Sequence, residues 1–567
     1  MRTIGRRGAP SASAVPGTEP LVVTRTAARG NKMQVNYLFF AAPVLITTSF
    51  ALAQGLSTAA RAAPQSPAVV TPAAMSAIGV VDKRYQSYNL EMIEVMGGKW
   101  WAPYNRQPAP GTAPAPEAPT RSVIGAALLL YQPPIDLYSA RLRKLAAGLS
   151  PAYIRVSDTW ANTMYFQDSN AADPAPAPPG FGLVLTGPQW KGVIDFSNAL
   201  DARIVTSFSI GAGTRNANGV WTPVEAEKFL RFTHNAGGTI AAAEFFNEPN
   251  LVAIGGAPKG YDAAAYGRDF KVFRAFIQKT DPDIKLLGPG PVGEGRVLGR
   301  MPAGLRSEEM LQAEGPGLDA VSYHFYGAVS QRCVSMGPAF QTTPDVALTR
   351  DWLFATVKEA EFYGNLRDRF EPGKPLWLSE TAEAACGGNP WAASFIDSFR
   401  YLNQLGALAQ HGVKVVMHNT LTGSDYGLID RDTLTPRPNY WAALLWRKLM
   451  GTTVLDPGTP PTPNLYLYAH CLAGHAGGVA LLAINADRTA TQQLKLPKAS
   501  TRYTLSAADL LGSQVQLNGT GLVLAENGGL PEMQGVHQPR GSVLLAPASI
   551  TFLAIPNAKN PSCDSTR

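Results

Sequence analysis

The chain has 567 residues, of which 45% are hydrophobic and 16% are charged. This length suggests roughly two to four domains, and the composition supplies a large apolar core and excludes a mainly disordered protein. The formal charge is +7, from 49 Lys and Arg against 42 Asp and Glu. A basic balance can indicate an anionic partner such as nucleic acid, a membrane surface or an acidic polysaccharide.

Residues 1–53 have the pattern of a secretory signal peptide. Six basic residues precede an apolar run at 37–53 that ends in Ala51-Leu52-Ala53, which predicts cleavage near Ala53 and a secreted or periplasmic protein. Met33, just before the run, is an alternative start to Met1. The run is short for a membrane anchor, which needs about 20 residues, so we expect no stable membrane insertion once the leader is removed.

Loss of this leader changes the meaning of the charge. It removes six of the 49 basic residues and one of the 42 acidic ones, so the basic balance almost disappears. The mature chain therefore gives no support for a nucleic-acid partner. Residues 54–77, rich in Ala, Pro and Ser, are interpreted as a linker.

The four cysteines are too few for a disulfide scaffold and lack the spacing of a zinc site. An exported protein can still form one bridge. Cys471 and Cys563 both lie in the C-terminal region, so we expect them to pair and expect Cys333 and Cys386 to stay reduced. The seven histidines are scattered, which predicts no metal site.

Residues 78–450 alternate short apolar runs with helical stretches. The runs are bounded by turn residues, as buried parallel strands are, and lie at 88–95, 153–156, 204–209, 243–246, 284–287, 320–324, 376–379 and 413–417. Helical periodicity occurs at 142–149, 223–234, 263–279, 345–363 and 391–411. Eight strands separated by helices predict a (β/α)₈ TIM barrel. Two Pro/Ala-rich passages, 107–119 and 171–179, are expected to be surface loops.

Residues 451–567 have a different pattern. Short β-rich runs follow one another at turn-punctuated intervals, which predicts a β-sandwich domain that packs against the barrel. A strand from residues 78–84 could join it. The predicted fold class is therefore α/β, a TIM barrel with a C-terminal β-sandwich.

Two glutamates follow predicted strands that lie nearly opposite each other in an eight-stranded barrel. Glu248 comes after the fourth strand and is followed by Pro249, which cannot extend a ladder, and Glu380 ends the seventh. Active sites of such barrels lie at the carboxyl ends of the strands. Facing carboxylates suit glycoside hydrolysis, by a retaining mechanism at about 5–5.5 Å and an inverting one at about 6.5–9.5 Å.

The chain resembles glycoside hydrolase family 79 of clan A, which contains the heparanases and bacterial β-glucuronidases. The ordered motifs that carry the resemblance are YQSYNLEMIEV (85–95), FFNEPN (245–250), VSYHFY (321–326), LWLSET (376–381), HNTLTGSDYGLID (418–430) and NYWAALLWRKLMGTTVL (439–455). The similarity therefore runs from about residue 85 through the β-rich region. It implies a retaining β-glucuronidase that acts on uronic-acid-containing glycans and needs no cofactor.

The resemblance also implies roles for individual residues. Glu248 would be the acid/base and Glu380 the nucleophile, Asn247 would contact the sugar 2-hydroxyl, and Tyr326 would donate to Glu380. The residues expected to bind substrate are Glu91, which would contact sugar hydroxyls, and Gly387, Gly388 and Tyr426, which would hold the uronic acid carboxylate. The Cys471–Cys563 pairing also matches a bridge of the family.

Other features come from this sequence alone. The turn at 288–293 is expected to place Glu294 near the barrel mouth, as a further substrate contact. Cys386 stands where the family has Tyr or a small residue, and Asp158 stands where relatives often have Gly. A free Asp158 carboxylate would repel an anionic substrate unless its side chain is turned away.

Two rival functions stay open. A clan A β-glycosidase or endo-glucanase acting on a neutral sugar would keep the fold and the two glutamates. A non-catalytic polysaccharide-binding protein would belong to a different class and is disfavoured because both glutamates and Tyr326 are present. The motifs do not distinguish exo from endo action, name the natural polymer or indicate an oligomeric state.

Overall fold

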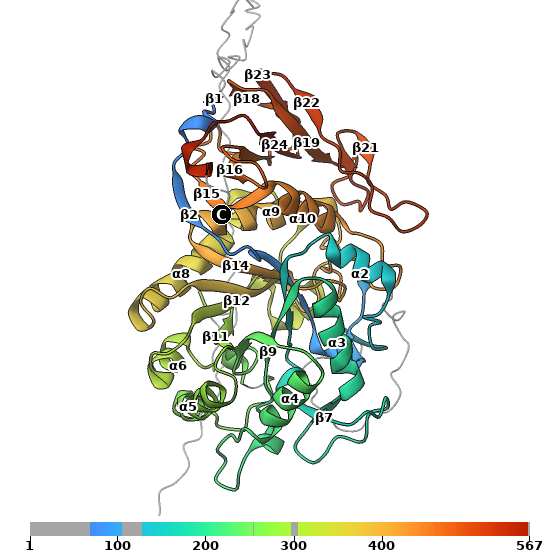
Figure 1. Ribbon diagram of the computed structural model, residues 1–567, viewed down its shortest axis with the longest axis vertical. Coiled ribbons are helices and arrows are strands. Elements are labelled where there is room, and N and C mark those ends of the chain that lie inside the picture. Colours follow the sequence, from blue (N-terminus) through green and yellow to red (C-terminus); the bar gives the residue numbers. More distant parts are fainter. Residues whose placement is uncertain (1–67, 105–127, 253, 296–303, 565–567) are drawn as a thin grey trace, which may run out of the picture. The chain divides into compact units, whose positions relative to one another are not determined.

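The structure is a computed structural model that describes residues 68–104, 128–252, 254–295 and 304–564 (Figure 1). The expected leader and both candidate start residues lie outside the described residues, as do most of the linker and the 107–119 insert. Among the residues described, no helix combines the length and apolar character that crossing a membrane requires.

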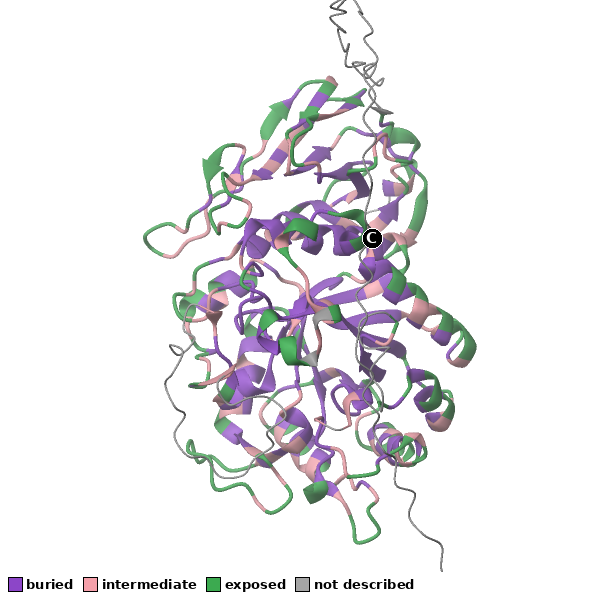
Figure 2. Ribbon diagram, turned by 180° about the vertical axis from the view of Figure 1, so that it is seen from behind, coloured by how far each residue is buried: buried purple, intermediate pink, exposed green. Residues whose placement is uncertain are grey.

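Eight parallel strands close into a barrel, because the last of them pairs with the first. In chain order they are β3 (Gln86–Leu90), β6 (Ala152–Val156), β9 (Ala202–Ser207), β10 (Ile240–Glu244), β11 (Lys285–Val292), β12 (Ala320–Val329), β13 (Leu376–Ala385) and β14 (Val413–His418). Each predicted run overlaps one of these strands, so the predicted TIM barrel is confirmed. The strands are almost wholly buried (Figure 2).

The first predicted strand was too long. The backbone leaves the sheet at Leu90, and residues 92–96 form the short helix α1 (Met92–Met96). Here the Glu94 carboxylate accepts a hydrogen bond from the Glu91 amide over 3.1 Å, as in a capping box. The apolar run at 88–95 was therefore one strand and one helix, both buried.

Helices cover the outside of the barrel. They are α2 (Ala140–Ala147), α3 (Gly187–Ala199), α4 (Val224–Asn235), α5 (Ala263–Thr280), α6 (Ser307–Glu314), α7 (Arg350–Leu353), α8 (Ala355–Phe370), α9 (Phe395–Gln410) and α10 (Pro438–Leu449). The sequence did not predict α3, α6 or α10. In α3 the Gly187-Pro188 pair suggests a loop but instead begins the helix, and the Thr186 hydroxyl caps it by accepting from the Gln189 amide.

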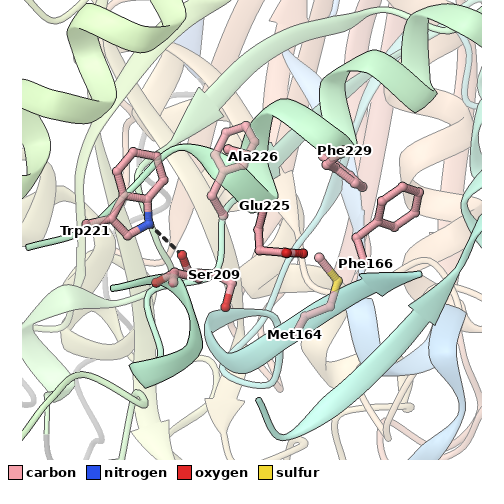
Figure 3. Close-up of a pocket in the computed structure, with 9 residues that line it drawn as sticks. Met164, Phe166, Ser209, Trp221, Glu225, Ala226 and Phe229 are labelled. Carbon is pink, nitrogen blue, oxygen red and sulfur yellow. Dashed lines mark hydrogen bonds between the residues drawn. The ribbon is translucent and has the colours of Figure 1, made fainter. Parts of the chain in front are cut away.

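Two small sheets extend from the barrel loops. Strands β4 (Gly98–Trp101) and β5 (Leu129–Gln132) are antiparallel, and β7 (Met164–Gln167) and β8 (Leu183–Thr186) are parallel. The Pro/Ala-rich passage at 171–179 connects β7 to β8 and is almost entirely exposed, as expected. Beside β7 the side chains of Met164, Phe166 and Phe229 line a small apolar cavity (Figure 3).

The C-terminal region consists of two sheets. The larger contains β2 (Ala77–Val80), β15 (Met450–Leu455), β16 (Leu465–Leu472), β17 (Val479–Asn485), β24 (Ser549–Ile555), β19 (Ser500–Ser506), β20 (Gln516–Leu517) and β21 (Thr520–Gly521), with β22 (Val536–Gln538) paired to β19. The smaller contains β1 (Ala68–Val69), β18 (Gln492–Leu496) and β23 (Gly541–Leu545). Apolar side chains from both sheets form one cluster, including Leu481, Leu494 and Val543.

The larger sheet packs on helix α9 of the barrel (Figure 1). The Tyr468 hydroxyl of β16 donates to the Asn403 side-chain oxygen over 2.6 Å. Gly406 lets the helix approach the Tyr468 ring, because a Cβ at this position would lie 2.2 Å from it. The larger sheet and the barrel therefore share a continuous hydrophobic core.

The first described residues differ from the expected linker. Residues 68–69 form β1 and residues 77–80 form β2, so the segment expected to be a linker up to residue 77 already contributes to both sheets. Strand β2 pairs antiparallel with β15. It corresponds to the strand that could join the C-terminal domain.

All four cysteines form disulfides. Cys471 of β16 is joined to Cys563 near the C-terminus, the pair expected from their positions. Cys333 and Cys386 are also joined, so the expectation that they stay reduced was wrong. They follow the neighbouring strands β12 and β13, whose loops adjoin at the carboxyl end of the barrel although the cysteines are 53 residues apart in sequence.

Candidate active site

Glu248 and Glu380 face one another at the carboxyl end of the barrel. Glu248 lies in the loop after β10, directly before Pro249, and its backbone is in the left-handed conformation (φ 48°). Glu380 lies within β13. One carboxylate oxygen from each and a ring nitrogen of His324 all lie within 4.8 Å of one another. In a retaining glycosidase the two carboxyl groups lie about 5–5.5 Å apart, so this close approach favours the retaining geometry.

The environment of Glu248 suits a proton donor. Its carboxyl is nearly buried, and one oxygen lies 3.2 Å from His324 Nδ1. Burial raises the pKa of Glu248, contact with His324 opposes this effect, and the nearby Glu380 charge raises the pKa further. A carboxyl whose pKa is raised keeps its proton closer to neutral pH, as a general acid requires.

Two donors hold the Glu380 carboxylate. The Tyr326 hydroxyl donates to Oε1 over 2.6 Å, and the Arg155 guanidinium donates through Nη1 to Oε2 over 2.6 Å. One donor on each oxygen fixes the plane of the carboxylate. The predicted contact between Tyr326 and Glu380 is therefore present in the structure.

Arg155 is a central site residue that the sequence analysis missed. It lies in β6, has no exposed surface, and besides Glu380 it donates to Glu244 (2.8 Å from Nη2) and to the Asn247 side-chain oxygen (2.7 Å). One guanidinium thus positions both Glu380 and Asn247. An arginine inside an otherwise apolar strand was the available signal, because a fully buried arginine must be paired.

Glu244 is the counter-ion of this arginine. Burial alone would raise the pKa of Glu244, but the Arg155 charge, together with hydrogen bonds and the charge of His324, outweighs burial and holds the pKa well below its usual range. The Ser322 and Ser379 hydroxyls donate to its other oxygen over 2.8 and 2.7 Å. Glu244 therefore remains an anion and holds the Arg155 guanidinium in place.

The carboxylates around His324 favour its charged form. Burial by itself lowers the pKa of this imidazole, but the surrounding carboxylates, Glu380 first among them, raise the pKa to about 9. From the sequence, His324 could either support the site or be a buried core histidine. Its contact with Glu248 places it beside the proposed proton donor.

Glu248, His324 and Glu380 are also side chains of the kinds that bind metal ions. A cation between them would lie next to the Arg155 guanidinium, which donates to Glu380, and next to a protonated His324. Both positive groups would repel it. Ion pairing within the protein therefore accounts for this cluster without a metal.

A second group of polar side chains adjoins the first. Asn419, at the end of β14, donates from Nδ2 to Glu91 (3.2 Å), and its Nδ2 also lies 3.0 Å from the Tyr326 hydroxyl. The Tyr426 hydroxyl donates to Glu91 over 3.1 Å. The structure thus brings the predicted residues Glu91, Tyr326 and Tyr426 together through Asn419, which was not predicted.

Glu91 is buried and surrounded by other acids. Burial, followed by the charges of Asp158 and Glu94, raises the pKa of Glu91 well above its usual range. Its Oε2 has no hydrogen-bond partner among the described residues. A carboxyl oxygen without a partner can accept a hydrogen bond from a sugar hydroxyl.

Gly387 and Gly388 follow β13 with φ angles of 82° and 84°. A Cβ at Gly387 would lie 2.8 Å from the Trp101 Cβ, and one at Gly388 would lie 3.2 Å from the Tyr426 ring, so both positions require glycine. The Gly388 amide donates to the Ala384 carbonyl over 3.1 Å. The expectation that both amides hold a carboxylate therefore needs correction, because the Gly388 amide is already used.

Two other acidic residues are engaged elsewhere. Both oxygens of Glu294 accept hydrogen bonds from the Ser307 amide at the start of α6, so we do not retain Glu294 as a substrate contact. Asp158 accepts from the backbone amides of Ile93 and Ala161, each over 2.7 Å. Its carboxylate therefore ties two loops together instead of facing a substrate.

No family model matches the chain. The chain is 30% identical to the heparanase of Rattus norvegicus over 489 residues, which cover 75% of this chain and 87% of the relative. It belongs to the heparanase family. This places the protein among the glycoside hydrolases. A further relative is the baicalin-β-D-glucuronidase of Scutellaria baicalensis, 31% identical over 252 residues that cover 42% of this chain and 46% of the relative.

Solved structures agree on the fold of this heparanase-family protein. A 4-O-α-L-rhamnosyl-β-D-glucuronidase from Fusarium oxysporum superposes with a TM-score of 0.55 at 13% sequence identity. The match covers 87% of this chain and all of that structure. At this identity the similarity supports the barrel with its appended sheets and nothing finer.

Proposed function

We propose that this heparanase-family protein is a retaining β-glucuronidase that releases β-linked glucuronic acid from glycans or glucuronides outside the cytoplasm. The observation that carries the retaining mechanism is the placement of Glu248 and Glu380 with carboxylate oxygens within 4.8 Å. Burial and the Glu380 charge raise the pKa of Glu248, as a general acid requires, whereas Tyr326 and Arg155 hold the carboxylate of Glu380, as a nucleophile requires. The two disulfides are in keeping with an exported protein.

In the first step Glu380 attacks the anomeric carbon while Glu248 gives its proton to the departing glycosidic oxygen. The product is a glycosyl ester of Glu380 and a free alcohol. Glu248, now ionised, then takes a proton from water, and the water oxygen displaces Glu380 from the anomeric carbon. The sugar leaves with its original stereochemistry and Glu248 regains its proton.

Neighbouring groups support these steps. Arg155 and Tyr326 hold the Glu380 carboxylate at the angle required for attack. Asn247, fixed by Arg155, would contact the sugar 2-hydroxyl. The charge on His324 stabilises Glu248 when it has lost its proton.

The preference for a uronic acid rests on the second group of residues. The Gly387 amide makes no hydrogen bond within the described residues, and it adjoins the loop that carries Tyr426. It would bind the substrate carboxylate together with the Tyr426 hydroxyl, which would exchange its hydrogen bond to Glu91 for one to the substrate. Glu91 would bind sugar hydroxyls. Asp158 does not oppose an anion here because its oxygens face backbone amides.

The test is hydrolysis of an aryl β-glucuronide, compared with the matching β-glucoside and β-xyloside. We expect the glucuronide to be preferred and Glu380→Ala to abolish its turnover. A variant of a distant buried carboxyl, Glu314→Gln, serves as the control for folding, since Glu314 is bonded to Tyr266 on the outside of the barrel. Full activity of Glu380→Ala would reject the mechanism, and preference for the glucoside would reject the substrate class.

A further inference from the structure

The Cys333–Cys386 disulfide lies directly beside the proposed carboxylate pocket. Cys386 immediately precedes Gly387 and is itself in the left-handed region, with φ 63°. A non-glycine residue adopts this conformation only when its surroundings hold it there. Its side chain is held by the bond to Cys333, which lies in the 3₁₀ segment η7 (Gln331–Met336) after β12.

The same two loops are joined by hydrogen bonds. The Ser330 amide donates to the Ala385 carbonyl over 2.9 Å, and the Ser330 hydroxyl donates to the Gly388 carbonyl over 2.6 Å. On the other side, the Asp425 amide donates to the Gly387 carbonyl over 3.1 Å. The backbone of the glycine pair is thus held between the loops after β12 and β14, and the disulfide is the covalent part of this arrangement.

Arg332 links these two outer loops to each other. It forms an ion pair with the Asp425 carboxylate and packs over the Tyr104 ring at 4.1 Å. Asp425 directly precedes Tyr426. Arg332, next to Cys333, therefore contacts Asp425, next to Tyr426. A shift of η7 would move both the Gly387 loop and the loop that carries Tyr426.

The disulfide is also part of the apolar wall of the site. Cys333 and Cys386 belong to one hydrophobic cluster with Trp101, Tyr326 and Tyr426. Neither cysteine contacts Glu248 or Arg155 through any bond described above. The disulfide adjoins the carboxylate pocket directly through Gly387, and it reaches Glu380 only through Tyr326, which lies in the same cluster and donates to Glu380.

We propose that the Cys333–Cys386 disulfide is a specificity-determining positioning element, which aims the Gly387 amide at the carboxylate of a uronic acid. This inference rests on the proposed function. Without the bond, Cys386 is free to leave its left-handed conformation, and the peptide that carries the Gly387 amide turns with it. The enzyme would still hydrolyse glycosides but would lose its advantage with the charged substrate.

The experiment compares two double variants on two substrates. Cys333→Ser/Cys386→Ser removes this disulfide, and Cys471→Ser/Cys563→Ser removes the distant one as a matched control. The substrates are an aryl β-glucuronide and its methyl ester, which lacks the carboxylate charge. We expect the first variant to raise KM for the acid about tenfold, in line with the loss of one charged hydrogen bond, with kcat within twofold and the ester unaffected. The control variant should match the wild type on both substrates.

A second measurement avoids the need for the first variant to fold without its bridge. In the Cys471→Ser/Cys563→Ser background only one disulfide remains, so the folded protein can be reduced, assayed and reoxidised. The KM for the acid should rise on reduction and return on reoxidation, with the thiol count confirming the state of Cys333 and Cys386. An unchanged KM for the acid would overturn the inference. So would an equal loss of kcat on both substrates, which would indicate a merely structural role.

The two levels of the proposal fail in different ways. If the wild type shows no preference for the acid over its ester, the proposed function is wrong, and the inference falls with it. If the wild type prefers the acid and keeps this preference without the disulfide, the function stands and the inference is wrong.

Discussion

Arg155 donates one guanidinium N–H to the Glu380 carboxylate over 2.6 Å, from a strand on the far side of the barrel interior. The same side chain pairs with Glu244 and holds Asn247. Orientation of the proposed nucleophile therefore depends on a buried charge network that contains no surface residue.

Replacement of Arg155 separates stability from catalysis. Arg155→Met should lower kcat at least tenfold, because Glu380 loses a charged hydrogen bond, and should lower the free energy of unfolding by about 3–5 kcal/mol, because Glu244 is left as a buried anion. In Arg155→Met/Glu244→Gln the anion is gone, so we expect stability, measured by urea denaturation, to recover while kcat stays low. Recovery of kcat in the double variant would contradict the positioning role of Arg155.

Glu248 is expected to govern the basic limb of the pH profile. Its pKa is raised by burial, and the protonated form is the active acid, so kcat/KM should be high below this pKa and fall as pH rises through it. Glu248→Gln should lose this limb. It should lower kcat/KM, which reports the first step alone, about 10²–10⁴-fold for a poor leaving group and much less for a nitrophenyl group, which departs without a proton. A uniform loss on both leaving groups would argue against the acid role.

His324 should make stability depend on alkaline pH. The pKa of His324 is raised to about 9 in the folded protein, above about 6.5 in the unfolded chain. The stabilisation is therefore complete below pH about 6.5 and is lost as pH rises towards 9, with a total on the order of 3 kcal/mol. The difference in free energy of unfolding between wild type and His324→Asn should shrink by this amount between pH 6 and pH 10. A difference that does not change with pH would show that the imidazole is neutral.

Tyr426 is expected to act in binding and not in the chemical step. Tyr426→Phe removes the hydroxyl that donates to Glu91 and, under the proposed function, one contact with the substrate carboxylate. We expect KM for an aryl β-glucuronide to rise about tenfold with kcat nearly unchanged. Tyr440→Phe is the matched control, since its buried hydroxyl donates to the Leu145 carbonyl instead. An equal rise in KM in both variants would remove Tyr426 from the binding site.

The barrel and the two glutamates could be predicted because their signals are local. A short apolar strand followed by turn residues marks each barrel strand, and Pro249 marks the point where the chain leaves β10 next to Glu248. Arg155 and Asn419 could not be placed in the same way. Their roles depend on partners more than 80 residues away in sequence, such as Glu244 and Glu91, that meet only when the barrel closes.

Errors arose where the local signal was ambiguous. The last residues of β3 and the first residues of α1 are equally buried, so a hydrophobicity pattern could not show that the strand ends at Leu90. Glu294 follows a barrel strand just as Glu248 does, but its carboxylate accepts hydrogen bonds from the start of a nearby helix at Ser307. The Cys333–Cys386 pair required knowledge of which loops adjoin.

Pairing of β2 with β15 affects how the enzyme can be divided. Val80 lies opposite Thr453, so the chain passes through the same sheet immediately before its first barrel strand and immediately after its last barrel helix. In a fragment cut to the barrel alone, the two terminal segments would be unpaired, whereas in the intact protein β2 and β15 are hydrogen-bonded to each other. The C-terminal sheets are therefore needed to stabilise the catalytic barrel. Deleting them should weaken the pairing of β14 with β3, which closes the barrel around the active site.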